Sequence, residues 1–285
     1  MHQLRLWGIT RIDGGHDVHS DFGGVKPRQL LEMLATQHGQ PCSKDVLADV
    51  LWEGRPPLSY AATLESHISV VRRHLADSGL PRTVLRTVHN GYVLTDEVRV
   101  DLTETRLALA EALARPAEEV YAGVETAAPW RLRDLLASSP YASFAIEVRE
   151  DMRGLLAASL RHASEGALAV GATDRALLLA RRAQAEDPVS DATQQVVLRA
   201  LMALDARCDA LRDYAAFRRR LREELGVEPS GTTQRLYLDL LARSANDDLQ
   251  RQRLERSLLL RLLGQVPEER RPSRSAPLLA ARATG

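Results

Sequence analysis

The pattern of hydrophobic and polar positions changes near residue 97. Before this point, short alternating runs such as Leu4-Arg5-Leu6 are interrupted by glycine-centred turns, which is typical of β-strands. From Asp101 onward, apolar residues recur with helical spacing. The pattern predicts three parts: a small mixed α+β domain at residues 1 to 97, an all-helical domain at 101 to 245, and a tail at 246 to 285.

Short strands are predicted at both ends of the first domain. At its start, an Asp-Gly-Gly turn signal at residues 13 to 15 separates two strands. At its end, strands at residues 84 to 88 and 92 to 94 are joined through His89, Asn90 and Gly91. Asn-Gly supplies the positive φ angles of a tight hairpin, so this pair is expected to form a β-hairpin.

Three helices are predicted between these strands. The first begins near Pro27, because the fixed φ of proline suits the first helical turn. The second opens with Ser43 as its N-cap and ends before Gly54. The third covers about residues 59 to 77. The order of elements is therefore strands, three helices and a hairpin.

The third helix has two distinct faces. Four apolar residues fall within one narrow stripe at about 100° per residue, which predicts the buried face. They are Leu64, Ile68, Val71 and Leu75. The opposite face carries Ala62, Ser66, Ser69, Val70 and Arg73. Small polar residues with arginine indicate a face that approaches another surface, as the second helix of a helix-turn-helix approaches the major groove.

Candidate DNA contacts surround this helix, and each one taken singly also has an ordinary surface or packing interpretation. The residues expected to face bases are Ser66, Ser69, Val70 and Arg73, with His67 at the edge of that face. Those expected to contact the DNA backbone or the groove beside the hairpin are Thr63, Arg72, Arg86, His89 and Asn90. Lys26 and Arg28, at the start of the first helix, add phosphate contacts. Their joint arrangement favours a winged helix that binds double-stranded DNA.

The helical domain has the spacing of stacked helix pairs. Its clearest motif consists of Ala176, Ala180, Ala183 and Pro188. This spacing resembles the second half of a tetratricopeptide unit, in which small residues permit close helix contact and proline ends the helix. Stacked helices of this kind bury their apolar faces on one another and offer concave surfaces to protein partners. A plain helical bundle is the alternative.

Two further signals lie toward the C-terminal end, the first at residues 223 to 230. Gly226 suits a C-cap after an arginine-rich helix, and the Glu-Pro-Ser sequence at 228 to 230 starts the next helix. In the tail, Asp247 and Asp248 are expected to begin an amphipathic helix that packs on the body of the protein. The last residues are expected to be disordered.

Four stretches of the first domain together resemble an OmpR-type winged-helix domain. They are residues 26 to 31 (Lys-Pro-Arg-Gln-Leu-Leu), 45 to 52 (Asp-Val-Leu-Ala-Asp-Val-Leu-Trp), 64 to 75, and 87 to 94 (Thr-Val-His-Asn-Gly-Tyr-Val-Leu). Trp52 followed by Pro56-Pro57 is similar to the variant found in the Streptomyces antibiotic regulatory protein family. Residues 223 to 230 resemble the signature of the bacterial transcriptional activation domain, the second module of that family. Val70 stands where the family often has arginine, and its apolar side chain suits contact with a thymine methyl group.

This resemblance implies a fold, an activity and a set of partners. The fold is mostly α, with an N-terminal winged helix-turn-helix followed by a tetratricopeptide-like helical domain. The activity is sequence-specific activation of a secondary-metabolite (antibiotic) biosynthetic cluster, with a homodimer bound to direct repeats in promoter DNA. RNA polymerase holoenzyme is recruited through its sigma subunit, beta flap and alpha C-terminal domain. A cytoplasmic, nucleoid-associated protein is expected, with no cofactor, metal or catalytic residue.

Composition narrows the classes of function. The chain has 38 basic and 38 acidic residues, which argues against a protein that coats nucleic acid without regard to sequence. The first domain holds 10 basic and 11 acidic residues, so DNA binding there depends on local placement of charge. Two cysteines make neither a disulfide framework nor a four-ligand zinc site. The sequence contains no membrane-length apolar stretch, no signal-peptide pattern, and no phosphate-loop, dinucleotide-binding or hydrolase motif.

Two other functions stay open at this point. One is a helical-repeat interaction or scaffold protein whose winged helix makes only protein contacts. The other is a regulator whose helical domain senses a small molecule, although the sequence has no pocket signature for one. A metal site at His16 and His19, beside Asp17 and Asp21, is less expected than a solvated loop.

Overall fold

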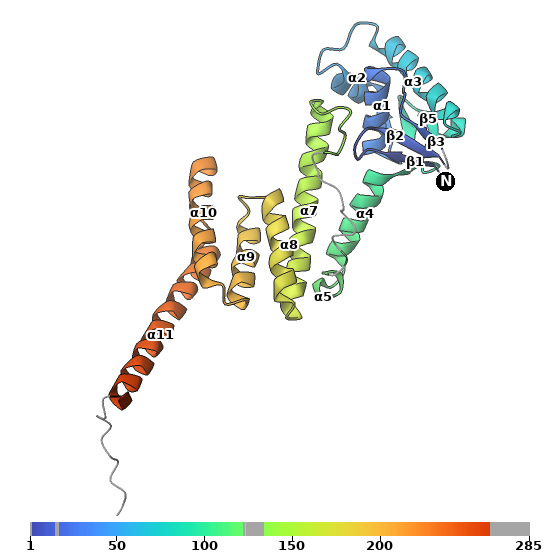
Figure 1. Ribbon diagram of the computed structural model, residues 1–285. Helices are drawn as coiled ribbons and strands as arrows, with labels where there is room; N and C mark the ends of the chain where they lie inside the picture. Colours follow the sequence, from blue (N-terminus) through green and yellow to red (C-terminus); the bar gives the residue numbers. More distant parts are fainter. Residues whose placement is uncertain (1, 15–16, 122, 124–133, 263–285) are drawn as a thin grey trace, which may run out of the picture. The chain divides into compact units, whose positions relative to one another are not determined.

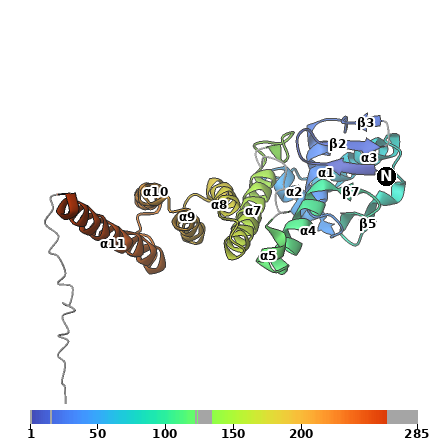
Figure 2. The same cartoon turned by 60° about the horizontal axis from the view of Figure 1, so that its bottom comes forward.

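The computed structural model of the 285-residue chain describes residues 2–14, 17–121, 123 and 134–262 (Figures 1 and 2). By their contacts, the residues form two units, Met1–Tyr237 and Leu238–Gly285. The fold is mostly helical with small sheets near the N-terminus, as predicted. Among the described residues, no helix combines the length and the apolar character needed to cross a membrane.

A four-stranded sheet forms the start of the chain. Its strands are β1 (His2–Arg5), β2 (Arg11–Gly14), β3 (Asp17–His19) and β7 (Arg99–Val100), in the order β3-β2-β1-β7. β1 is antiparallel to β2 and parallel to β7, so the end of the first domain returns beside its start. Asp13 and Gly14, which were predicted to lie in a turn, form the last residues of β2, because Gly14 pairs with His2 across the sheet. The third turn residue, Gly15, lies outside the described residues.

Three helices follow, as predicted, and pack together around the core of the first domain. They are α1 (Val25–Thr36), α2 (Lys44–Leu51) and α3 (Tyr60–Asp77). The predicted stripe of α3 is buried, since Leu64, Ile68, Val71 and Leu75 are each 3% exposed or less. Ser43 caps α2, because its Oγ accepts a hydrogen bond from the Val46 N–H at 3.2 Å. Pro27 lies in the first turn of α1, where its missing N–H has no helical partner to lose.

A hairpin and one short strand complete the first domain. The strands are β4 (Cys42–Ser43), β5 (Leu85–Val88) and β6 (Gly91–Leu94), in the order β4-β6-β5, and the short 3-10 helix η1 (Arg82–Val84) precedes β5. We call the β5–β6 hairpin, residues 85 to 94, the wing. The hairpin is confirmed, and Asn90 has the predicted positive φ, at 55°. Gly91 does not, because it is the first residue of β6 and pairs with Val88. A Cβ at Gly91 would lie 2.2 Å from the carbonyl oxygen of Cys42, so glycine is needed where β4 pairs with the wing.

Stacked helices make up the second part of the chain. They are α4 (Asp101–Ala114), α5 (Ala117–Val120), α7 (Ser143–Ala169), α8 (Thr173–Glu186), α9 (Asp191–Ala203), α10 (Arg207–Leu225) and α11 (Gly231–Leu262). Helices α7 to α10 lie side by side in chain order, each in contact with the next (Figures 1 and 2). Small residues permit this stacking, since Ala176, Ala180 and Ala183 of α8 are completely buried, as their spacing predicts.

Local signals fix the connections between these helices. Gly226, the predicted C-cap of α10, has φ 69°, and its N–H binds the carbonyl oxygen of Arg222. Asp205, just before α10, has φ 55°, a conformation that aspartate tolerates better than most side chains. Asp191 at the start of α9 accepts hydrogen bonds from the Ser230 N–H at 3.1 Å and the Thr233 hydroxyl at 2.6 Å. These bonds hold the Glu-Pro-Ser segment against α9.

The last helix differs from its prediction. α11 is continuous from Gly231 to Leu262, so the prediction that Asp247 and Asp248 begin a separate helix is wrong. The reason is that no proline or glycine follows Gly231 within this range, and the helix has no cause to end. Leu254 and Leu258 are 64% and 57% exposed, and packing of the tail on the body stays a prediction. The expected disordered end lies in residues 263–285, outside the described residues.

The winged helix and the helices that follow it share one hydrophobic core. The core includes Leu4, Leu34, Leu102, Leu135 and Leu156. Asp101, buried at the junction, accepts hydrogen bonds from the backbone N–H groups of Leu6 at 2.9 Å and Trp7 at 3.2 Å. These bonds tie the first turn of α4 to the end of β1, so β1 and α4 hold a fixed relation to each other.

Close packing of α5 on α7 depends on Gly166. A Cβ at this position would lie 1.9 Å from the carbonyl oxygen of Ala117, so Gly166→Ala must push α5 away from α7. We expect the free energy of unfolding, measured with urea, to fall by about 1–3 kcal/mol. Gly154→Ala on the same helix is the matched control, because nothing lies within 4 Å of a Cβ there. The control should raise the free energy of unfolding by about 0.5–1 kcal/mol, and equal effects of the two substitutions would contradict this account.

Burial of Glu32 predicts a pH-dependent stability. Glu32 of α1 is completely buried, and this burial raises its pKa above the ordinary 4.5, although hydrogen bonds from Ser139 and Thr10 and the charge of Arg28 oppose the shift. The folded protein therefore binds this proton more tightly than the unfolded chain, and its stability falls as pH rises from about 4.5 through the folded pKa. Glu32→Gln removes the charge, so the stability of the variant relative to the wild type should grow as pH rises through that window.

Urea unfolding at a series of pH values measures the difference. The control is Glu111→Gln, which changes an exposed glutamate of α4. Parallel stability curves for Glu32→Gln and the wild type would show that Glu32 does not carry this pH dependence.

Candidate nucleic-acid interface

The exposed side of α3 is a shallow row of small side chains with one cation. We call Ala62, Ser66, Ser69 and Arg73 the reading face; all four are exposed and lie opposite the buried stripe. The Ser66 hydroxyl donates to the Ala62 carbonyl at 3.0 Å, and that of Ser69 donates to the Glu65 carbonyl at 2.9 Å. Both hydroxyl groups therefore fold back on the helix and keep the face low, which suits close approach to base edges.

Thr63, at the N-terminal end of α3, also has a hydroxyl group that folds back on the helix. It is half-buried, and its hydroxyl donates to the Ser59 carbonyl at 3.2 Å. The oxygen keeps a free lone pair but no free proton, so Thr63 offers DNA an acceptor and a methyl group. Phosphate oxygens accept only, so a phosphate contact by Thr63 requires its hydroxyl to rotate away from the helix.

Arg73 is the free cation of this face. Within the described part of the chain, its guanidinium has no hydrogen-bond or ion-pair partner, and the side chain is exposed. A hydrogen bond from the Gly23 N–H is the main cause of the lowered pKa of Asp21, in the loop between β3 and α1, and the charge of Arg73 adds to this shift. An unpaired guanidinium carries donors in the fork geometry that matches guanine or phosphate oxygens.

Arg72, one residue earlier, has a different setting. Its Nε donates to the Leu85 carbonyl at 3.0 Å, and its Nη2 donates to the Thr87 hydroxyl at 2.8 Å. The guanidinium also lies 5.9 Å from the centre of the Tyr92 ring. Arg72 therefore connects α3 to both strands of the wing and sets the position of the wing beside the reading face.

The tip of the wing is open to solvent. Arg86, His89 and Asn90 are all exposed, as a hairpin that enters or borders a DNA groove requires. Asn90 needs its left-handed backbone for the turn, so its side chain is held at the outermost point of the hairpin.

Two predicted residues of α3 are less accessible than expected. Val70 is half-buried, because a loop glycine, Gly23 at φ 75°, lies so near that a Cβ there would be 2.4 Å from Val70 Cγ1. His67 is also half-buried and stacks on Trp52, with ring centres 6.5 Å apart. Burial, followed by the charge of Lys26, lowers the pKa of His67, which favours its neutral form at neutral pH. DNA contact by these two residues stays a prediction.

The two cations of α1 are held by the protein itself. Lys26 Nζ donates to the Leu51 carbonyl at the end of α2. Arg28 donates to the Ser138 carbonyl at 2.8 Å, and its Nε lies 3.6 Å from the buried carboxylate of Glu32. Arg28 thus has a structural position between the two domains, and its predicted phosphate contact has to compete with these bonds.

Three residues beside the interface were not among the sequence candidates. Lys44, in the first turn of α2, bonds to Glu65 at 2.7 Å and lies 5.8 Å from the Tyr92 ring centre. The hydrogen bond to Glu65 raises the pKa of Lys44 and keeps it charged. Thr87 and the buried Tyr92 hold Arg72, as described above. The available signal was the position of Lys44 directly after an N-cap, where backbone N–H groups also favour phosphate.

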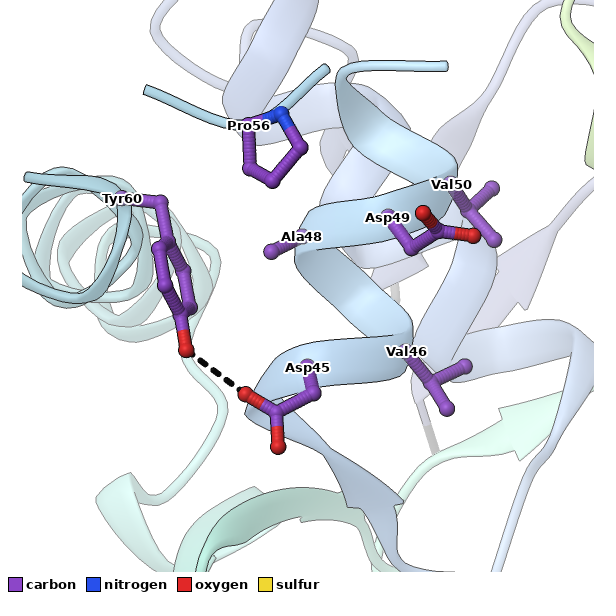
Figure 3. A pocket seen from close by; sticks show the side chains of 7 residues that line it. All are labelled: Asp45, Val46, Ala48, Asp49, Val50, Pro56 and Tyr60. Atoms are coloured by element: carbon purple, nitrogen blue, oxygen red, sulfur yellow. Dashed lines mark hydrogen bonds between the residues drawn. The ribbon is translucent and has the colours of Figure 1, made fainter. Parts of the chain in front are cut away.

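A separate pocket lies between α2 and the start of α3 (Figure 3). It has a volume of about 470 Å³ and is lined by Asp45, Val46, Ala48, Asp49, Val50, Pro56 and Tyr60, which we call the acidic pocket. The Tyr60 hydroxyl of α3 donates to the Asp45 carboxylate of α2 at 2.7 Å (Figure 3). The carboxylates of Asp45 and Asp49 in the acidic pocket disfavour a phosphate ligand. Val46, at 57% exposure, and the fully exposed Leu58 favour an apolar contact.

Both parts of the chain match known protein families. Residues 24–94 match the family described as transcriptional regulatory protein, C terminal, and residues 96–241 match the bacterial transcriptional activator domain. A winged helix joined to such an activator domain defines the class of the protein, a transcriptional regulator.

Individual relatives narrow this class. Regulatory protein DnrI of Streptomyces peucetius is 32% identical over 76% of this chain and 84% of its own length. Transcriptional regulator RedD of Streptomyces coelicolor is 27% identical over 84% of this chain and 70% of its own length. The chain belongs to the Streptomyces antibiotic regulatory protein family of transcriptional activators, as its sequence motifs indicate.

A solved structure shares the fold. Mycobacterium tuberculosis EmbR, in complex with a low-affinity phosphopeptide, aligns with a TM-score of 0.69 at 24% identity, over 85% of this chain and 65% of that structure. The chain spans about 60% of the full length of EmbR. The likeness supports the same succession of a winged helix and stacked helices.

The contrast between Arg72 and Arg73 gives a stability test. Arg72→Ala removes two hydrogen bonds to the wing and should lower the free energy of unfolding by about 1–2 kcal/mol. Arg73→Ala removes no such bond and should leave stability unchanged. Thermal unfolding of the two variants measures both effects. Equal destabilisation by the two changes is inconsistent with the roles assigned to these residues.

Proposed function

We propose that this protein activates transcription of a secondary-metabolite biosynthetic cluster by binding direct repeats in promoter DNA. The observation that carries the proposal is the reading face of α3, with its folded-back serine hydroxyls and the unpaired Arg73, beside a wing whose tip is exposed. A protein of this kind acts in the cytoplasm, at the nucleoid.

The contacts are assigned by their chemistry. Ser66, Ser69 and Arg73 face base edges, with Val70 at the margin of the face where a thymine methyl group is in reach. Arg86, His89 and Asn90 place the wing on the backbone or in the adjacent groove. Arg72 contacts phosphates, and so does Thr63 once its hydroxyl rotates away from the Ser59 carbonyl. Lys44 joins this set because it pairs with Glu65 of α3.

Paired binding follows from the balance of charge. With 10 basic and 11 acidic residues in the first 97, one copy neutralises few phosphates, so its affinity and its dependence on salt are modest. Two copies on direct repeats spaced by about one helical turn, about 10–10.5 base pairs, lie on the same side of the duplex and support each other.

Recruitment of RNA polymerase is the second part of the proposal. The acidic pocket supports it, because exposed Val46 and Leu58 with Asp45 and Asp49 suit a protein surface with apolar and basic groups better than DNA. The family resemblance names the sigma subunit, beta flap and alpha C-terminal domain of the holoenzyme as partners. DNA binding raises the effective concentration of the activator beside polymerase, so weak protein contacts suffice.

Footprinting of the promoter of the adjoining gene cluster, with and without polymerase holoenzyme, tests this function. We expect protected repeats and an upstream extension of the polymerase footprint. Arg73→Ala should weaken operator binding by about 1–3 kcal/mol, because it removes a base contact. Arg212→Ala, which changes an exposed arginine of α10 paired with Asp209, is the control and should bind normally.

Absence of any protected site at moderate salt would favour the alternative of a scaffold whose winged helix makes only protein contacts. Normal operator binding by Arg73→Ala would remove Arg73 from the reading face.

A further inference from the structure

A short segment before α7 docks on the winged helix. We call residues 134 to 140 the docking segment. The Gly8 N–H donates to the Asp134 carbonyl, and the Leu136 N–H donates to the Leu6 carbonyl, both at 2.7 Å. Between these bonds, Trp7 and Leu135 pair as an isolated antiparallel bridge. The segment therefore continues the backbone hydrogen bonding of the chain just beyond β1.

The two serines of the docking segment reach α1 and the loop before β2. The Thr10 N–H donates to Ser138 Oγ at 2.9 Å, and Arg28 of α1 donates to the Ser138 carbonyl at 2.8 Å. The Ser139 hydroxyl donates to one oxygen of the buried Glu32 carboxylate, and the Thr10 hydroxyl donates to the other, each at 2.5 Å. Glu32 therefore depends on one donor from each domain.

Arg149 of α7 holds the docking segment from the other side. Its Nε, Nη1 and Nη2 donate to the carbonyl oxygens of Leu135 at 2.8 Å, Pro140 at 2.9 Å and Leu136 at 3.1 Å. The planar guanidinium fixes all three carbonyls in one arrangement. Leu136, between them, has φ 55°, a backbone conformation that a leucine keeps only when its surroundings enforce it. The shape of the segment is thus imposed by Arg149.

Partial separation of the two domains at this contact is energetically unfavourable. Leu135 and Leu136 are completely buried in the shared core, and Glu32 is completely buried beneath Ser139. Partial separation exposes these leucines and leaves a buried carboxylate with one hydroxyl donor instead of two, which is unfavourable. Intermediate arrangements of the two domains are therefore poorly populated while the segment keeps its shape.

We infer that Arg149 is a positioning residue that holds the helical domain in one fixed orientation relative to the reading face, and that activation of transcription requires this orientation. The inference rests on the proposed function, because it assigns a role in activation to a contact that includes no residue of the reading face or of the acidic pocket. If the helical domain moved freely, the winged helix would bind DNA equally well. The helical domain would then present its surface to polymerase only part of the time.

The first test measures the orientation in the free protein, without DNA or polymerase. Cys208 is exposed on α10 and accepts a spin label, a second label is placed by Arg82→Cys on η1, and buried Cys42 is replaced by alanine. Electron–electron distance measurements should give one narrow distribution for this labelled parent. Arg149→Gln should broaden it, because a glutamine amide has too few donors for three carbonyls.

Arg153→Gln, one turn further along α7, is the matched control. Arg153 pairs with Glu150 on its own helix and does not reach the docking segment, so the distribution should stay narrow. Ser139→Ala is a milder second variant, which removes one donor from Glu32 and changes little volume. It should broaden the distribution less than Arg149→Gln, and it keeps the test valid if Arg149→Gln does not fold.

The second test compares DNA binding with activation, using the full chain, its operator and RNA polymerase holoenzyme in transcription in vitro. Arg149→Gln should leave the operator dissociation constant unchanged and reduce transcript yield by about tenfold. The reason is that the effective concentration of the helical domain beside polymerase falls when its fixed orientation becomes flexible. Arg153→Gln should match the wild type in both measurements.

The outcomes separate the two proposals. Failure of the wild type to bind DNA overturns the proposed function, whereas the distance measurements still decide whether Arg149 fixes the orientation. A narrow distribution in both Arg149→Gln and Ser139→Ala overturns the positioning role. A broad distribution with full activation shows that orientation is not required, and it overturns the second half of the inference.

Discussion

The buried carboxylate of Glu32 constrains how the two domains are joined. It lies on α1 of the winged helix, yet one of its two hydroxyl donors, Ser139, belongs to the segment that leads into α7. Arg28, on the same helix, supplies the nearest positive charge and also binds the Ser138 carbonyl. A charged group without water is tolerated only with such partners, so the site forms only when both domains are in place. The shared hydrophobic core around Leu135 and Leu136 gives this polar contact its dry surroundings.

Arg72 and Arg73 are neighbours on α3 but have different surroundings. Arg72 turns toward the wing and binds Leu85 and Thr87, while Arg73 faces outward with no partner among the described residues. The first determines where the wing lies, and the second is available to a ligand. Under the proposed function, this difference lets a domain with slightly more acidic than basic residues present a selective surface to DNA. Positive charge is placed at a few positions, whereas the acidic side chains of Asp45 and Asp49 lie in the acidic pocket.

Local signals in the sequence predicted most of the fold. The stripe from Leu64 to Leu75, the Ser43 cap and the Gly226 C-cap depend on residues within a few positions of one another, and all three are confirmed. The settings of Arg28 and His67 were not predictable in this way. Arg28 binds a carbonyl 110 positions later in the chain, and His67 stacks on Trp52, which follows α2. For α11, Asp247-Asp248 suggested a helix start, but an acidic pair does not interrupt a helix that lacks proline and glycine.

The close approach of Gly23 to α3 has a consequence for transferring operator preference between regulators. Position 70 lies under the loop before α1, and a Cβ at Gly23 would also come within 2.9 Å of the His74 ring. The space available to the side chain at position 70 is therefore set by a residue 47 positions earlier, outside the recognition helix. A grafted α3 sequence with a larger residue there meets this loop before it meets DNA. If α3 reads the operator as proposed, transfer of its full preference requires exchange of α3 together with residues 20 to 24, and exchange of the helix alone transfers only part of it.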